Sequence, residues 1–144
     1  MEIVNLAKVL VKNTKGEYLV LRSSEWPENP TRSLQPDIAG GFVEENETHQ
    51  IAASRELNEE AGILVDPSDL RLVYAHSEVY KEKSYNRLIF LTEVVDDTPV
   101  SLSWEHDKFW WSSEEDFLNL KWRRPYPEIF AYLQKINVMK MTND

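Results

Sequence analysis

The chain has 144 residues, of which 42% are hydrophobic, and its formal net charge is −9. This length suits one domain, 1–144, with its own core, and the acidic balance argues against stable nucleic-acid binding. No apolar run approaches the roughly 20 residues of a membrane span, and the N-terminus resembles a strand instead of a signal peptide, so we expect a cytoplasmic protein without a membrane partner. Cysteine is absent, which excludes thiol chemistry.

The N-terminal part predicts two strands followed by a long loop. Partly alternating apolar residues indicate strands over 3–11 and 17–22, and the Asn-Thr-Lys-Gly sequence at 13–16 predicts a turn that joins them as a hairpin. Three prolines interrupt 23–36, which predicts a loop. The segment 37–41 is expected to be short and extended.

Helix signals follow this extended segment. Thr48 is a suitable N-cap, and Gly62 suits the left-handed conformation that ends a helix. The residues between them include strong helix formers and no proline. Ala53, Leu57 and Ala61 recur at helical spacing, so they predict a narrow apolar stripe that faces a core.

The second half of the chain predicts three strands, a helical turn and a helix. The strands are expected over 70–80, 85–95 and 108–111, the capped turn at 113–116, and an amphipathic helix over 125–138. Ile129, Leu133 and Ile136 form the apolar face of that last helix. Strands and helices therefore mix in one layered α/β domain.

Three glutamates share one face of the first predicted helix. Glu56, Glu59 and Glu60 stand at i, i+3 and i+4, beside the apolar stripe. Like charges at this spacing destabilise a helix by about 0.2–0.5 kcal/mol per pair, and the helix dipole disfavours anions near the C-terminus. A divalent cation would remove this cost, and oxygen ligands suit Mg²⁺ or Mn²⁺. The alternative is a solvated acidic face.

The residues around these glutamates argue against that alternative. Segment 41–63, GFVEENETHQIAASRELNEEAGI, fills every fixed position of the pattern Gx5Ex7REUxEExGU, in which U is apolar. In this segment the chain resembles the Nudix hydrolases. The resemblance implies an α/β/α sandwich with a mixed sheet. It also implies Mg²⁺- or Mn²⁺-dependent hydrolysis of the pyrophosphate linkage in a nucleoside diphosphate derivative, such as a (d)NTP, a nucleotide sugar, ADP-ribose or a dinucleoside polyphosphate.

The resemblance also implies a set of metal ligands and catalytic residues. The implied ligands are the Gly41 carbonyl and the carboxylates of Glu56, Glu59, Glu60 and Glu105. One of these four glutamates would accept the proton of the attacking water.

Two further residues of the pattern are expected to support the ligands. Glu47 would lie behind them, and Arg55 would orient a glutamate through charge-assisted hydrogen bonds. Asp107 and Glu114 compete with Glu105 for its role, and His106 is an alternative for proton transfer.

Candidate substrate contacts are arginines for phosphate and aromatic residues for a base. They are Arg22, Arg32, Arg87, Trp26, Phe42, Tyr80 and Trp110. The alternatives are exposed arginines and aromatic core packing. Trp26 lies in the proline-rich loop, where a large apolar residue can cover a site.

Two other functions compete with hydrolysis. A nucleotide-sensing binding module of the same fold usually loses carboxylates of the pattern, yet all are present here. An isoprenoid diphosphate isomerase of this fold usually needs a cysteine near its site, and this chain has none. The expected partner is a small-molecule nucleotide, and the sequence is also compatible with a homodimer.

Overall fold

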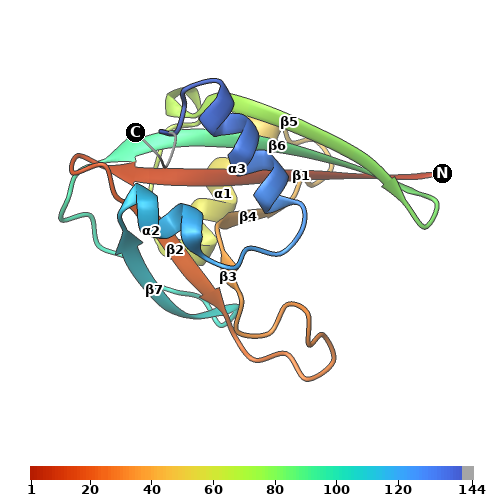
Figure 1. Ribbon diagram of the computed structural model, residues 1–144. Helices are drawn as coiled ribbons and strands as arrows, with labels where there is room; N and C mark the ends of the chain where they lie inside the picture. The colour runs from red at the N-terminus through yellow and green to blue at the C-terminus, as the bar shows by residue number, and fades with distance from the viewer. Residues whose placement is uncertain (141–144) are drawn as a thin grey trace.

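The computed structural model describes residues 1–140 (Figure 1). Its elements in chain order are β1 (Glu2–Asn13), β2 (Tyr18–Ser23), β3 (Pro36–Asp37), β4 (Ala39–Phe42), α1 (His49–Ala61), the 3-10 turn η1 (Pro67–Asp69), β5 (Arg71–Tyr80), β6 (Lys83–Val94), β7 (His106–Ser112), α2 (Glu114–Asn119) and α3 (Tyr126–Lys135). These elements agree with the predicted strands and helices to within a few residues at their ends.

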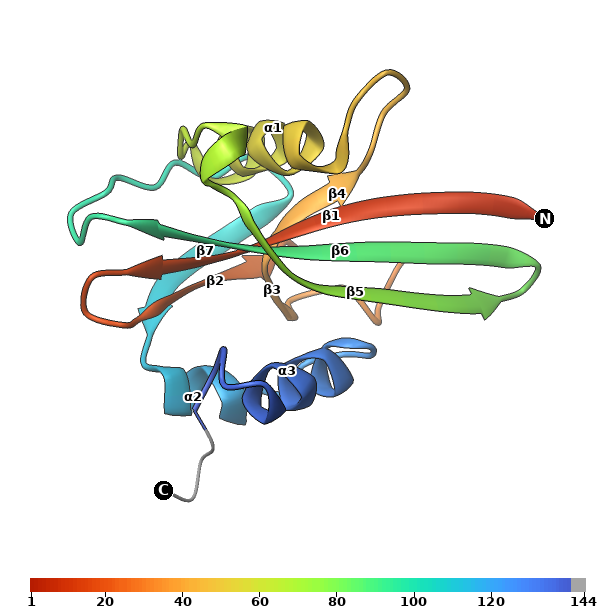
Figure 2. The same ribbon diagram turned by 90° about the horizontal axis from the view of Figure 1, so that it is seen from above.

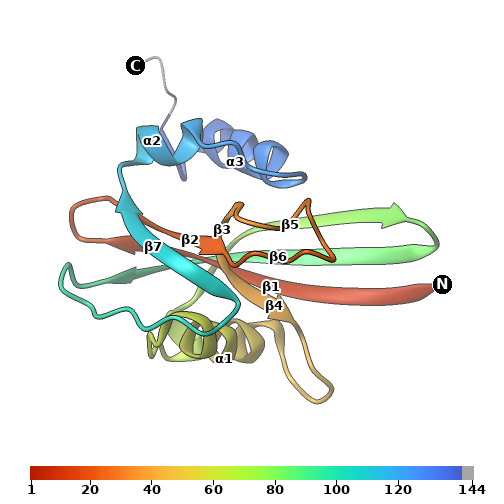
Figure 3. The same cartoon turned by 90° about the horizontal axis from the view of Figure 1, so that it is seen from below.

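The strands form one mixed sheet with helices on both faces. The order is β3-β2-β1-β6-β5, with β4 paired to β1 and β7 paired to β2. The β1–β6 pair is parallel, and every other pair in the described sheet is antiparallel. α1 covers one face, and α2 with α3 covers the other (Figure 2, Figure 3). The predicted α/β/α sandwich is confirmed.

The predicted hairpin of β1 and β2 is correct only near its turn. The single registered pair between these strands is Lys12↔Tyr18. Beyond it β4 takes the edge of β1, whereas β3 pairs with β2. The two strands therefore diverge because segment 36–42 takes over their hydrogen bonds. This divergence matters because β4 carries two of the glycines that precede the acidic helix.

Two apolar cores lie on the two faces of β1. Ala7 and Val9 pack in the core beneath α1, whereas Leu10 packs in the core beneath α2 and α3. The predicted stripe on α1 is confirmed, since all three of its residues are fully buried. On α3 the prediction needs one correction. Ile136 is 42% exposed because the helix ends at Lys135 and leaves Ile136 as its C-cap.

The ends of α1 form as its sequence predicts. The Thr48 hydroxyl accepts a hydrogen bond from the Ile51 N–H at 3.1 Å. Gly62 has φ +69 and donates its N–H to the Asn58 carbonyl. Among residues 1–140, no helix combines the length and the hydrophobicity needed to cross a bilayer.

Candidate active site

A cleft of about 280 Å³ opens beside the N-terminal half of β1. Leu6 and Lys8 of β1 line it together with β4, the acidic face of α1 and three loops. It gathers seven residues that the sequence singled out: Arg32, Gly41, Phe42, Glu56, Glu60, Arg87 and Glu105. The fold thus brings acidic and basic residues that are far apart in the sequence to one site.

Gly41 leaves room for the carboxylate of Glu56. A Cβ atom at position 41 would lie 2.7 Å from Oε1 of Glu56, so any larger residue would displace that carboxylate. The Glu56 side chain is only 13% exposed. Burial raises its pKa above the ordinary value. The site therefore holds this acid in surroundings that disfavour its negative charge.

Glu60 is more deeply buried than Glu56. Its Oε1 accepts a hydrogen bond from the Gly40 N–H at 2.8 Å. Burial raises the pKa of Glu60 to about 7, although Lys8 and the Gly40 N–H oppose the shift. Gly40 has φ +142, and a Cβ there would lie 2.2 Å from the Ala7 carbonyl oxygen. Glycine therefore allows β4 to approach β1 closely enough to hold Glu60.

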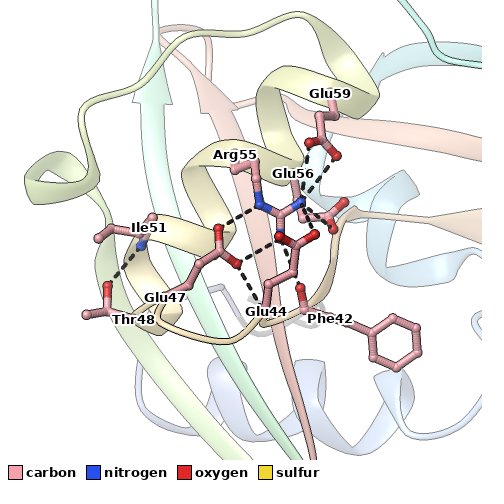
Figure 4. Close-up of polar contacts among 8 residues, drawn as sticks. All are labelled: Phe42, Glu44, Glu47, Thr48, Ile51, Arg55, Glu56 and Glu59. Atoms are coloured by element: carbon pink, nitrogen blue, oxygen red, sulfur yellow. Dashed lines mark hydrogen bonds and ion pairs between the residues drawn. The ribbon is translucent and has the colours of Figure 1, made fainter.

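Arg55 connects the acids of α1 to the preceding loop (Figure 4). Its guanidinium donates to both carboxylate oxygens of Glu47, at 2.7 and 3.0 Å. It also donates to Glu56 and Glu59 at 3.2 Å and to the Phe42 carbonyl at 3.1 Å. The hydrogen bond with Glu47 raises the pKa of Arg55 and lowers that of Glu47. Arg55 and Glu47 thus form a fixed charged support behind the cleft.

Glu59 is more exposed than Glu56 and Glu60, and its carboxylate shares Nη1 of Arg55 with that of Glu56. Its side chain is 56% exposed, points to Arg55 (Figure 4) and does not line the cleft. Within residues 1–140, no group of three or more His, Cys, Asp or Glu side chains is placed to hold a metal ion. The oxygen donors of Gly41, Glu56, Glu60 and Glu105 in the cleft are nevertheless of the chemical type that Mg²⁺ and Mn²⁺ prefer.

Glu105 reaches the cleft from the loop before β7. Its carboxylate lies 3.3 Å from the Arg32 guanidinium. Ser24 holds the loop, because it donates its N–H to the Glu105 carbonyl and its hydroxyl to the Trp104 carbonyl, at 2.9 and 2.6 Å. The competing acids are elsewhere, since Asp107 pairs with Arg22 and Glu114 accepts from the Lys140 N–H.

A buried charged network in the wall of the cleft was missed by the sequence reasoning. The Asp37 carboxylate lies 3.4 Å from the Lys8 ammonium, 3.1 Å from Nε2 of His106 and 3.8 Å from the Arg123 guanidinium. Burial alone would raise the pKa of Asp37, but Lys8, His106 and Arg123 outweigh it and hold that pKa well below its usual range. A lone lysine in the apolar run of β1 was the available signal.

The same network changes the interpretation of His106. The imidazole is fully buried and does not line the cleft. It contacts Asp37, so its position is that of a structural partner beneath the site.

Four of the predicted substrate contacts line the cleft or the cavity next to it. Phe42, Arg32 and Arg87 line the cleft. Tyr80 is 58% exposed and lines a neighbouring cavity with Arg87.

The remaining predicted contacts lie elsewhere. Arg22 makes a bidentate pair with Asp107 and lines neither cavity. The Trp26 ring lies 5.2 Å from that of Trp104 and 4.6 Å from the Arg32 guanidinium, so it supports a cleft residue from outside. Trp110 packs against the core beneath α2 and α3.

The chain is similar to known proteins over most of its length. The family model described as NUDIX domain matches residues 5–133. The chain belongs to the Nudix family. Family membership and the relatives below identify this Nudix protein as a hydrolase acting on phosphoanhydride bonds.

The relatives match most of this chain. The chain is 29% identical over 124 residues to diphosphoinositol polyphosphate phosphohydrolase 3-alpha of Mus musculus, with 86% of this chain and 71% of that protein covered. Among solved structures, the MutT protein of Methanosarcina mazei Go1 has a TM-score of 0.80 at 26% identity, covering 94% of this chain and 96% of that one. A binary complex of the C. elegans Ap4A hydrolase has a TM-score of 0.72 at 25% identity, with the same coverage.

Proposed function

We propose that this Nudix hydrolase cleaves the pyrophosphate linkage of a small nucleotide or a related diphosphate compound, with Mg²⁺ or Mn²⁺ as its metal. The observation that carries the proposal is one cleft in which Glu56 and Glu60 lie with Arg32 and Arg87. Carboxylates suit the cation, and arginines suit the phosphate oxygens. Relatives named for diphosphoinositol polyphosphates and for Ap4A support a substrate rich in phosphate.

The cleft carboxylates are our choice of metal ligands. Glu56 and Glu60 would hold the cation together with the Gly41 carbonyl and Glu105, and Glu59 is the further acid expected to take part. Gly41 fits this role because the absence of a side chain leaves the Glu56 carboxylate open to the cleft. When bound, a divalent cation neutralises phosphate charge and lowers the pKa of a coordinated water.

The other residues of the cleft bind and orient the substrate. Arg32 and Arg87 donate charge-assisted hydrogen bonds to phosphate oxygens. Phe42, which is 65% exposed, offers a ring face to a base or a sugar. Glu105 is the candidate acceptor of the water's proton, because it enters the cleft from a segment separate from α1. Arg55 keeps the α1 acids in place through Glu47.

A substrate panel tests the proposal. Purified protein is incubated with (d)NTPs, nucleotide sugars, ADP-ribose and Ap4A, with Mg²⁺, with Mn²⁺ or with EDTA, and the products are identified chromatographically. We expect cleavage at a phosphoanhydride bond that stops with EDTA and returns when metal is added. Tight binding of a nucleotide without turnover under any of these conditions would favour the nucleotide-sensing module instead.

A further inference from the structure

A second cavity, of about 620 Å³, adjoins the active-site cleft. Four arginines line both spaces: Arg32, Arg87, Arg123 and Arg124. The chain has only seven arginines and a net charge of −9, so this concentration of positive charge is local and runs against the overall balance. We call these four residues the arginine cluster.

The arginine cluster is only loosely neutralised. Among the described residues that line the second cavity, Glu78 is the one acid, and it pairs with Arg87 at 3.0 Å and Arg124 at 3.3 Å. The other contacts are long and single: Arg32 to Glu105 at 3.3 Å, Arg124 to Glu128 at 3.6 Å and Arg123 to Asp37 at 3.8 Å.

Hydrogen-bond donors of the cluster are therefore left for a ligand. A guanidinium carries five N–H donors, and it binds phosphate oxygens in pairs. Nε of Arg32 is buried and has no hydrogen-bond partner among residues 1–140. By contrast, Arg22 outside both cavities is matched by the two oxygens of Asp107 at 2.9 Å each. An anion with several oxygens would satisfy donors that the protein itself does not.

The cluster is assembled from separate parts of the fold. Arg87 comes from β6, Arg32 from the loop between β2 and β3, and Arg123 and Arg124 from the segment before α3. Glu78 fixes the spacing between two of these parts, because a single carboxylate contacts Arg87 and Arg124. Such an arrangement orients several guanidinium groups toward one space.

We propose that the second cavity is a subsite for further phosphate groups of the substrate, beyond the linkage that is cleaved. This inference rests on the proposed hydrolase function and narrows its substrate class. The favoured substrates carry a phosphate-rich portion on the far side of the reacting diphosphate. Nucleotide sugars and ADP-ribose, which place an uncharged sugar there, would leave the arginine cluster unmatched.

A binding experiment tests the subsite independently of turnover. Inositol hexakisphosphate is the probe, because it is dense in phosphate and has no pyrophosphate bond to cleave. We expect calorimetry to detect its binding to the wild-type protein, and Arg124→Gln to weaken that binding about tenfold through loss of one charge-assisted contact. The Arg124 side chain is 71% exposed, so this variant should fold.

Two further variants separate a built subsite from general attraction to positive charge. Arg71→Gln removes an arginine that lines neither space, and it should leave the affinity for the probe unchanged. Glu78→Gln removes the acid that shares Arg87 and Arg124, and it should preserve or tighten binding. Equal weakening in Arg71→Gln and Arg124→Gln, or no binding of the probe at all, would overturn the inference.

Kinetics then separate the subsite from the hydrolase function. The ratio of kcat/KM for a phosphate-rich substrate, such as a diphosphoinositol polyphosphate, to that for ADP-ribose should fall about tenfold in Arg124→Gln. An unchanged ratio with active enzyme would refute the subsite and leave the hydrolase intact. Binding of the probe without hydrolysis of any phosphoanhydride would refute the proposed function and leave the anion site.

Discussion

The surroundings of Arg55 and of Glu78 are opposite arrangements of charge near one cleft. Arg55 is a single cation that contacts four carboxylates, those of Glu44, Glu47, Glu56 and Glu59. Glu78 is the single carboxylate that the described part of the chain places in the cavity lined by the four residues of the arginine cluster. We call Glu56 and Glu60, the two α1 carboxylates that line the cleft, the acidic wall, and we call the arginine cluster the basic wall. A substrate that meets both would have its phosphates between them.

The two regions differ in how completely their charges are paired. Arg55 is hydrogen-bonded to both oxygens of Glu47 and to a backbone carbonyl, so most of its donors are used within the fold. The arginine cluster has mostly single, longer contacts. Saturated pairs fix a structure, whereas unsaturated donors can bind a ligand. This contrast is why we propose that Arg55 holds the α1 acids in place, whereas the arginine cluster binds phosphate groups of the substrate.

The largest expected effect comes from removing the negative charge of Asp37, which contacts Arg123 of the arginine cluster. Asp37→Asn leaves Lys8 buried opposite a neutral amide and weakens the hold on Arg123. Breaking a buried ion pair from one side costs about 3–5 kcal/mol, so we expect the free energy of unfolding, measured with urea, to fall by this amount. Asp97→Asn, at an exposed position, is the matched control and should change little.

The same carboxylate predicts a pH dependence of stability. Because the pKa of Asp37 is lower in the folded protein, its contribution is present above about pH 4 and is lost as the pH falls through the folded-state value. The stability of Asp37→Asn should therefore depend less on pH than that of the wild type at the acidic end. Parallel curves would remove Asp37 from the acid response.

Removing a carboxylate from the acidic wall should have the next largest effect. Glu60→Gln keeps an oxygen that can accept from the Gly40 N–H, so the fold should survive. We expect kcat to fall by about a hundredfold or more, because transition-state charge stabilisation of this kind is worth several kcal/mol. Steady-state kinetics with the best substrate of the panel measure the loss.

The control for this variant lies outside the cleft. Glu115 is exposed on α2, and Glu115→Gln should keep wild-type kcat. Full turnover by Glu60→Gln would break the comparison of the two walls, because Glu60 would then have no part in metal binding.

Local sequence was enough to predict the acidic wall. The glycines, the cap at Thr48 and the helical spacing of Glu56 and Glu60 all lie within one continuous segment, so their geometry follows from one helix and its approach. Glu59 was predicted to share the site by the same spacing; its carboxylate contacts the same Arg55 nitrogen as that of Glu56, but it does not line the cleft. Spacing fixes where a side chain starts on a helix and leaves open which partner it finds.

The basic wall could not be predicted in the same way. Arg32, Arg87 and Arg124 come from three segments that are distant in the sequence: the loop between β2 and β3, the strand β6 and the segment before α3. Of these, sequence reasoning named Arg32 and Arg87 but neither Arg123 nor Arg124. The adjacency of Arg123 and Arg124 in an acidic chain was the one sequence signal for their role. The divergence of β1 from β2 was likewise decided by non-local pairing with β3 and β4.

The smallest expected effect concerns the support supplied by Arg55. Arg55→Lys keeps a positive charge but loses the paired hydrogen bonds to Glu47, because an ammonium cannot reproduce the planar fork of a guanidinium. Residues that orient metal ligands typically contribute about 10–100-fold in metal affinity or activity. We expect the Mg²⁺ concentration for half-maximal activity to rise about tenfold in this variant. Arg71→Lys, at a position outside both cavities, should follow the wild-type curve. An unchanged Mg²⁺ requirement in Arg55→Lys would mean that the paired contact with Glu47 does not position the acids. The fully paired Arg55 would then have no supporting role to set against the partly paired arginine cluster.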